Sequence, residues 1–219
     1  MSWAAVFWSG LTALGVAMRE FAIHTHDMNI GFFKDISNRS YIIASCGIIF
    51  FAFLSLFFMG RVPICECGYI KLWHGVTMSS ENSQHISDWY SFSHIIHGFG
   101  FYLLFRFIAP RWPVGARFLA ALLLESSWEV FENTDFIINR YREATISFDY
   151  YGDSVLNSIS DILFMVLGFF AAYHFPVWSI VAATIFFETF VLYFIRDNLA
   201  LNIIMLLYPF EFIKQWQGG

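Results

Sequence analysis

Long apolar runs alternate with short polar segments along most of this chain. The clearest run is Tyr41–Met59, which holds no charged side chain and has about the length that a helix needs to cross a bilayer. Gly60 and Pro63 then end it, since proline cannot continue a helix. Further runs predict spans at Phe92–Ala109, Arg117–Phe136, Ser154–His174 and Val177–Ile195.

The two ends of the chain are less regular. Trp3–Met18 predicts a short first span, with an interfacial helix as the alternative. Leu199–Ile213 is again apolar and predicts either a last short span or an interfacial helix. We therefore predict an all-α fold, a polytopic transmembrane helical bundle of about six spans. Residues 1–219 are expected to form a single integral-membrane domain.

Two polar connections interrupt the predicted spans. Arg61–Trp89 is long, and connections of this length are usually functional; Asn139–Asp149 is interpreted as a loop. Cytoplasmic ends of spans are rich in lysine and arginine. The residues that mark this side are Lys34, Arg39, Arg106, Arg111 and Arg117. Both polar connections then face outward, to the periplasm in a Gram-negative inner membrane, although Arg140 and Arg142 argue the other way.

The composition indicates a membrane protein. Hydrophobic residues make up 58% of the chain and charged residues 13%, whereas soluble domains carry about 25% charged residues. The net charge is −5 and no block of lysine or arginine forms a basic patch, so we expect no binding to nucleic acid. The predicted location is the cell inner membrane, as a multi-pass protein among membrane lipids. The sequence names no protein partner.

Polar residues occur at helical spacing in three consecutive predicted helices. The sets are His94 and His97; Glu125, Glu129 and Glu132, with Asn133; and Asp153, Asn157 and Asp161. Within each set, positions three or four apart share one helix face. All three sets lie at the outer end of helices that are consecutive and therefore usually adjacent. Since ionisable groups at membrane depth are costly, we expect one polar site there.

Such a set of side chains suits a divalent metal. Imidazoles and carboxylates together bind zinc, iron and manganese. The predicted metal ligands are His94, His97, Glu129 and Asp161. The predicted catalytic acid–base groups are Glu125, Glu129 and Asp153. Other polar residues expected at the site are Glu132, Asn133, Asn157, Arg196, Asp197 and His85. The alternative is a structural ion-pair network, in which Arg140, Arg142 and Arg196 neutralise Glu132 or Asp153.

The outer connection also carries Cys65 and Cys67. A Cys-x-Cys without a second cysteine pair is a weak zinc signal. Two loop thiols or a local disulfide is the alternative.

Several motifs resemble those of an uncharacterised family of small proteobacterial inner-membrane proteins. They include Pro63-Ile-Cys65-Glu-Cys67-Gly, Ser93-His94-Ile-Ile-His97-Gly98, Trp128-Glu129-x-x-Glu132-Asn133, Asp149-Tyr-Tyr-Gly-Asp153 and Ile195-Arg196-Asp197-Asn198. The resemblance extends from about Met59 to Gly219. It marks residues 59–219 as a family-like core and residues 1–58 as variable N-terminal spans. It implies an inner-membrane location and adds no chemistry.

A fainter resemblance is to VanZ-like membrane proteins. They share a His that opens one span, a Glu near the end of the next, and an Asp with an Asn that opens a third. Here these would be His94 or His97, Glu125 or Glu129, and Asp153 with Asn157. The resemblance implies a site that faces cell-envelope or lipid-linked substrates.

Three functions remain open from the sequence, and whether the protein is an enzyme is undecided. The first is a metal-assisted hydrolase or transferase of lipid or cell-envelope substrates. The second is a proton- or cation-coupled transporter, which a water-filled path from the site to Glu188 would favour. The third is a non-enzymatic membrane assembly or scaffold subunit, which a network with every carboxylate paired would favour. An aromatic-rich groove open to lipid would strengthen the first.

Overall fold

The computed structural model describes residues 36–145 and 150–219. Contacts within the chain separate Met1–Ile36 from Ser37–Gly219, and every helix discussed below belongs to the second unit. The predicted first span, Trp3–Met18, lies outside the described residues.

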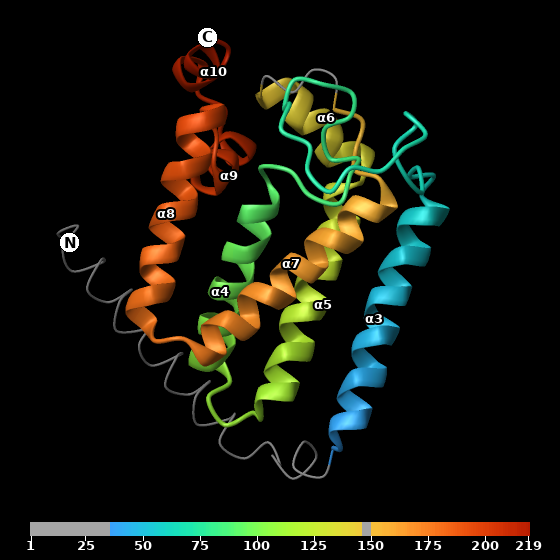
Figure 1. Ribbon diagram of the computed structural model, residues 1–219, viewed down its shortest axis with the longest axis vertical. Coiled ribbons are helices and arrows are strands. Elements are labelled where there is room, and N and C mark those ends of the chain that lie inside the picture. Colours follow the sequence, from blue (N-terminus) through green and yellow to red (C-terminus); the bar gives the residue numbers. More distant parts are fainter. Residues whose placement is uncertain (1–35, 146–149) are drawn as a thin grey trace, which may run out of the picture. The chain divides into compact units, whose positions relative to one another are not determined.

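All regular structure in the described residues is helical, which confirms the predicted all-α class. The helices are α3 (Asn38–Phe58), α4 (Ser91–Ile108), α5 (Val114–Glu132), α6 (Asp135–Ala144), α7 (Val155–His174), α8 (Val177–Ile195), α9 (Leu199–Leu207) and α10 (Glu211–Gln217). The long helices alternate in direction along the chain (Figure 1). The C-terminal end of α5 and the N-terminal ends of α4 and α7 therefore lie at one end of the bundle.

Three of the described helices are long and apolar enough to cross a membrane: α3, α7 and α8. Their surfaces expose large apolar side chains, including Phe51 on α3 at 72% and Trp178 on α8 at 74%. So much exposed apolar surface is costly in water and is expected against lipid tails. The structure thus supports the prediction of a membrane protein.

Among the described helices, α4 and α7 pack together most extensively, and two glycines permit their close approach. A Cβ atom on Gly98 would collide with the backbone of α7 at Met165 and Phe169, and one on Gly168 would collide with Ile95 of α4. Small residues allow this close approach between helices in membranes. The crossing therefore fixes the separation of α4 and α7 near the site.

The predicted boundary between the helix that corresponds to α5 and the loop after it is wrong. The predicted helix Arg117–Phe136 ends at Glu132 in the structure, and a separate helix, α6, covers most of the segment interpreted as the loop Asn139–Asp149. Asn133 causes the break, because its side-chain amide donates to the Glu129 carbonyl and to the Asp153 carboxylate across the bundle. The chain therefore turns where the sequence shows neither glycine nor proline.

The last apolar segment does not form a membrane-crossing helix. It contains α9, whose nine residues extend about 14 Å, less than half of the roughly 30 Å hydrocarbon core. Beyond Pro209, α10 has seven residues. Of the two alternatives for Leu199–Ile213, a last span is therefore excluded.

The connection Arg61–Trp89 contains no helix or strand and lies over the polar end of the bundle (Figure 1). The start of α7 holds it through backbone and side-chain bonds: Ser154 N–H donates to the Ser83 carbonyl, and the Asn157 amide donates to the His85 carbonyl. Gln84 in return donates to the Gly152 carbonyl. The connection therefore covers this end of the bundle and is hydrogen-bonded to it; Arg61–Trp89 is called the cover below.

Candidate functional site

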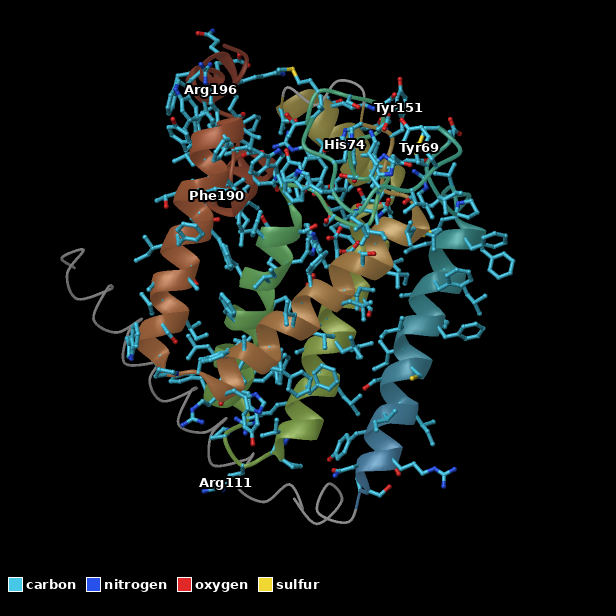
Figure 2. The ribbon with its side chains drawn as sticks, viewed as in Figure 1. Tyr69, His74, Arg111, Tyr151, Phe190 and Arg196 are labelled. Carbon is cyan, nitrogen blue, oxygen red and sulfur yellow. A yellow bond between two sulfur atoms is a disulfide. The ribbon has the colours of Figure 1, made fainter. Side chains whose placement is uncertain are left out.

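Helices α4, α5 and α7 place the predicted polar residues at the covered end of the bundle. Arg111, in the turn between α4 and α5, lies at the opposite end from Tyr69 and His74 of the cover (Figure 2). Most of the polar residues brought together are buried; they are His94, Glu125, Glu129, Asn133, Asp153, Asn157 and Asp161.

Glu125 connects the two histidines of α4. Its Oε1 lies 2.7 Å from Nδ1 of His94, and its Oε2 lies 3.1 Å from Nδ1 of His97. The Glu125 side chain is fully buried. A carboxylate that accepts from Nδ1 fixes the ring and leaves Nε2 as the free nitrogen, which is how carboxylates orient metal-binding histidines.

Glu129 lies one turn further along α5, and its carboxylate accepts no hydrogen bond from the described residues. It is fully buried, and neither Oε1 nor Oε2 has a hydrogen-bond partner among the described residues. Close to it is His94, whose Nδ1 lies 3.3 Å from Glu129 Oε1. A buried carboxylate without donors is costly, and these oxygens are among those that could bind a cation.

Asp161 lies on α7 across from His94. Its Oδ2 is 3.9 Å from His94 Nε2, and its Oδ1 accepts from the Ser91 hydroxyl. One ligand atom each from His94, Glu129 and Asp161 lies within 4.8 Å of the other two, a spacing at which three side chains could hold a metal ion.

A second set of acids adjoins the first and shares Glu129 with it. Ligand atoms of Glu129, Glu132 and Asp153 also lie within 4.8 Å of one another. Tyrosine hydroxyls orient the two outer acids: Tyr141 donates to Glu132, and Tyr150 donates to Asp153. Burial raises the pKa of Asp153 above its ordinary value, because the charged form loses its hydration.

A further ligand group consists of His94, His97 and Glu125. Its members already hydrogen-bond to one another. It is therefore better described as the support of the first group than as a separate site.

The arginines proposed to neutralise these acids do not do so. Arg140 donates to the Leu206 carbonyl at 2.8 Å, Arg142 to the Tyr150 carbonyl at 2.6 Å, and Arg196 to the Trp216 carbonyl at 3.0 Å. Within residues 36–145 and 150–219, no lysine or arginine forms an ion pair with an acid of the cluster. The predicted arginine–acid network is therefore wrong for the described part of the chain.

A cavity of about 430 Å³ opens onto the cluster, by which we mean the two ligand groups that share Glu129. Its lining includes the polar side chains of His94, His97, Glu132, Asp153 and Asp161. It also includes the apolar side chains of Phe101, Leu124, Trp128, Leu199, Ile203 and Leu206. Leu124 and Ile203 are also exposed on the outer surface, at 40% and 47%. The cavity is thus lined by both polar and apolar side chains, and two of the apolar ones also lie on the exposed apolar surface.

Three predicted residues lie away from the cluster. His85 is in the cover, and its Nε2 donates to Glu81 at 3.1 Å. Arg196 is exposed near the C-terminus (Figure 2). Asp197 lines the cavity but lies with Tyr90 and Gln217, both of which donate to it. Burial raises its pKa to about 6.

Tyrosines at the site were not predicted from the sequence. Tyr90, Tyr141 and Tyr150 all line the cavity and donate to acids. The sequence does contain a signal for Tyr150: it lies three residues before Asp153, close enough in the chain for its hydroxyl to donate to that acid. Tyr141 belongs to the segment that was interpreted as a loop.

In the cover, Cys65 and Cys67 form a disulfide, which is one of the alternatives left open. Their sulfur atoms lie near Glu81 and His85. Glu81 accepts from Lys71, Tyr69 and His85, and its hydrogen bond to Lys71 lowers its pKa to about 2. This cluster is therefore internally satisfied, unlike the one around Glu129.

Comparison with known proteins places the chain in a family. The family model DUF2585, described as a protein of unknown function, matches residues 56–219. A UPF0314 protein of Paracoccus denitrificans is 58% identical over 172 residues, which cover 78% of this chain and 89% of that protein. One of Rhizobium etli is 55% identical over 185 residues, covering 84% and 95%. One of Sphingopyxis alaskensis is 52% identical over 184 residues, covering 84% and 97%.

No solved structure matches the chain. The fainter resemblance to VanZ-like proteins is not tested by these matches and stays a prediction. The resemblance of the core motifs to a proteobacterial family of unassigned activity is confirmed, and the chain belongs to the DUF2585 family.

Proposed function

We propose that this protein is a multi-pass inner-membrane enzyme, a metal-dependent hydrolase or transferase that acts on a lipid or lipid-linked ester or phosphoester. The observation that carries the proposal is Glu129, with two buried oxygens that lack hydrogen-bond partners among the described residues, in an acid group next to a cavity lined by both polar and apolar side chains.

The ligands in this proposal are His94, Glu129 and Asp161. One imidazole with two carboxylates is a donor set that zinc, iron and manganese accept. Glu125 orients His94 from behind through Nδ1. A divalent ion bound there would polarise a carbonyl or phosphoryl oxygen and lower the pKa of water.

His97 is the proposed proton carrier, whose Nε2 takes a proton from the attacking water or hydroxyl and returns it to the leaving group. It lines the cavity, and its Nδ1 is held by Glu125 at 3.1 Å. Its Nε2 is then the nitrogen left to exchange a proton with substrate, as in other carboxylate–histidine pairs. Glu125 thus supports both functions, as orienting group for His94 and for His97.

The apolar part of the cavity lining indicates the substrate class. Phe101 of α4, Leu124 and Trp128 of α5, and Ile203 of α9 all line the cavity. Acyl chains bind such surfaces by apolar contact. The polar group of the substrate would then lie against the His/acid floor.

The transporter alternative receives no comparable support. Glu188, the acid expected on a transport path, accepts from the N–H groups of Leu199 and Ala200. It therefore caps the start of α9, where a carboxylate is favourable.

Elemental analysis of the detergent-purified protein tests the metal. We expect near-stoichiometric zinc, iron or manganese in the wild type, lost in His94→Ala and retained in His174→Ala. His174 is a matched control because it is exposed at the far end of α7 and bonds to a backbone carbonyl. Absence of metal in the wild type, with His94→Ala merely less stable, would contradict the proposal.

Incubation of the metal-loaded protein with inner-membrane lipid extract tests the reaction. Mass spectrometry should show loss of one lipid class and release of its headgroup or acyl chain, with no change for Asp161→Asn. Equal product from wild type and Asp161→Asn would contradict catalysis at this site.

A further inference from the structure

Glu129 belongs to two ligand groups at once. It forms one with His94 and Asp161 and another with Glu132 and Asp153, and in each group the ligand atoms lie within 4.8 Å of one another. A single ion in the first group would leave the second with buried acids and no cation. We propose that the site holds two divalent ions, with Glu129 bridging them; this inference rests on the proposed function.

The state of Glu129 fits a bridge. Both of its oxygens, Oε1 and Oε2, are buried and without hydrogen-bond partners among the described residues. A ligand to a single ion ordinarily leaves its second oxygen for a donor. Here neither oxygen has one, so each is left for an ion of its own. Bridged ions in two-metal sites lie about 3.5–4 Å apart.

The other ligands of the second ion are already oriented. Tyr141 donates to Glu132 at 2.8 Å, while Tyr150 and Asn133 donate to the two oxygens of Asp153 at 3.0 and 2.9 Å. Hydrogen bonds of this kind hold carboxylate ligands in place. Each carboxylate oxygen that accepts one such bond keeps a lone pair for a cation.

The charge of the second group favours a cation as well, since the only basic side chain paired with it among the described residues is His94, beside Glu129. Three carboxylates converge there, and no lysine or arginine of the described residues forms an ion pair with any of them. Tyrosine and amide donors supply dipoles and no net positive charge. An ion would supply it.

The arrangement leaves open positions toward substrate. Glu132, Asp153, His94 and Asp161 line the cavity, whereas Glu129 is not among its lining residues. Glu129 therefore lies behind the two positions, and the cavity lies in front. The donors also differ: the first position has an imidazole, and the second has oxygen atoms only. We infer that the second position takes a hard ion, Mn²⁺ or Mg²⁺.

Titration of the chelator-treated full chain with Mn²⁺, followed by electron paramagnetic resonance, tests this inference. We expect two Mn²⁺ per chain and a spectrum of two exchange-coupled ions. Asp153→Asn and Glu132→Gln should each bind one Mn²⁺ and give the spectrum of an isolated ion. Asp135→Asn, an exposed acid on α6, is the control and should keep both ions and their coupling.

The outcomes separate this inference from the proposed function. One Mn²⁺ in the wild type, unchanged in Asp153→Asn and Glu132→Gln, would overturn the second ion and leave the enzyme proposal standing. Two ions without coupling would overturn the bridge. No bound metal at all would overturn both. Thermal melting of each variant identifies any that fails to fold, and two independent variants keep the test decisive.

Discussion

Asn133 joins the end of α5 to the start of α7 through one side chain. Its Nδ2 donates to the Glu129 carbonyl, to Asp153 Oδ2 and to Ser158 Oγ, and its Oδ1 accepts from the Asp153 N–H. The residue is fully buried. The Asn133 side chain therefore ends α5, orients Asp153, and sets the distance between the acids of α5 and those at the start of α7.

At the same scale, Glu125→Gln should weaken metal binding without abolishing it. The amide keeps the shape of the carboxylate but loses the charge that holds both histidines. Loss of such an orienting group typically lowers metal affinity about 10–100-fold. Competition against a chelator of known affinity measures the change.

Glu143→Gln is the matched control, because Glu143 is exposed on α6. Equal metal affinities of the wild type and Glu125→Gln would show that Glu125 does not orient a ligand.

At the scale of elements, the approach of α4 to α7 sets the geometry of the site. Gly98 lies four residues after His94, and Gly168 lies seven residues after Asp161, on helices whose backbones nearly touch. The ligands therefore depend on a contact that lies one to two turns away from them.

Gly98→Ala should destabilise the bundle by about 1–3 kcal/mol, the usual cost of overpacking. The added methyl group would meet backbone atoms of α7, which cannot rotate away. Thermal unfolding in detergent measures the loss.

Gly100→Ala lies on the same helix with open space around the new methyl group, so its stability should be equal to or above that of the wild type. A Gly98→Ala protein as stable as Gly100→Ala would refute the close crossing.

The cover should loosen in acid. Its Glu81 has a pKa of about 2, below the ordinary 4.5, because Lys71 donates to it. The resulting stabilisation is fully present above about pH 4.5 and is lost as the pH falls toward 2, since the unfolded state binds the proton first. Hydrogen exchange of residues 61–89 should therefore accelerate over that range.

Glu81→Gln removes the titration. Its cover should exchange faster than wild type at neutral pH and should lack the acceleration that protonation of Glu81 causes between about pH 4.5 and 2. A wild-type cover with the same exchange protection at pH 3 and pH 6, after correction for intrinsic rates, would be inconsistent with this contact.

The elements show what the sequence could and could not predict. The spacing of His94 and His97, and of Glu125, Glu129 and Glu132, predicted their shared faces correctly, because helical periodicity alone determines them. The start of α6 could not be predicted, because the break at Asn133 depends on Asp153, twenty residues away. The partners of Arg140 and Arg142 are backbone carbonyls, which leave no mark in a sequence.

At the scale of the whole molecule, the charges predict an orientation. The turn with Arg106, Arg111 and Arg117 should be cytoplasmic, which places the cover and the cavity on the periplasmic side. Lipid substrates would then be reached from the outer leaflet.

Thiol labelling tests this orientation. In a Cys46→Ser background, Asn139→Cys should react with a membrane-impermeant maleimide in intact cells, and Arg111→Cys should react only after lysis. Both positions are exposed. The reverse pattern would place the cavity in the cytoplasm and would rule out an outer-leaflet substrate.

The bonds between the cover and α7 also impose an order on biosynthesis. The Gln84 carbonyl accepts from the Ser154 hydroxyl, which lies 70 residues later in the chain. At 5–20 residues per second, the ribosome needs about 4–14 s to translate these 70 residues. During this interval the cover can make only contacts within itself or with earlier segments, such as the bond between Lys71 and Glu81. Its hydrogen bonds to α7 can form only once that helix has been synthesised.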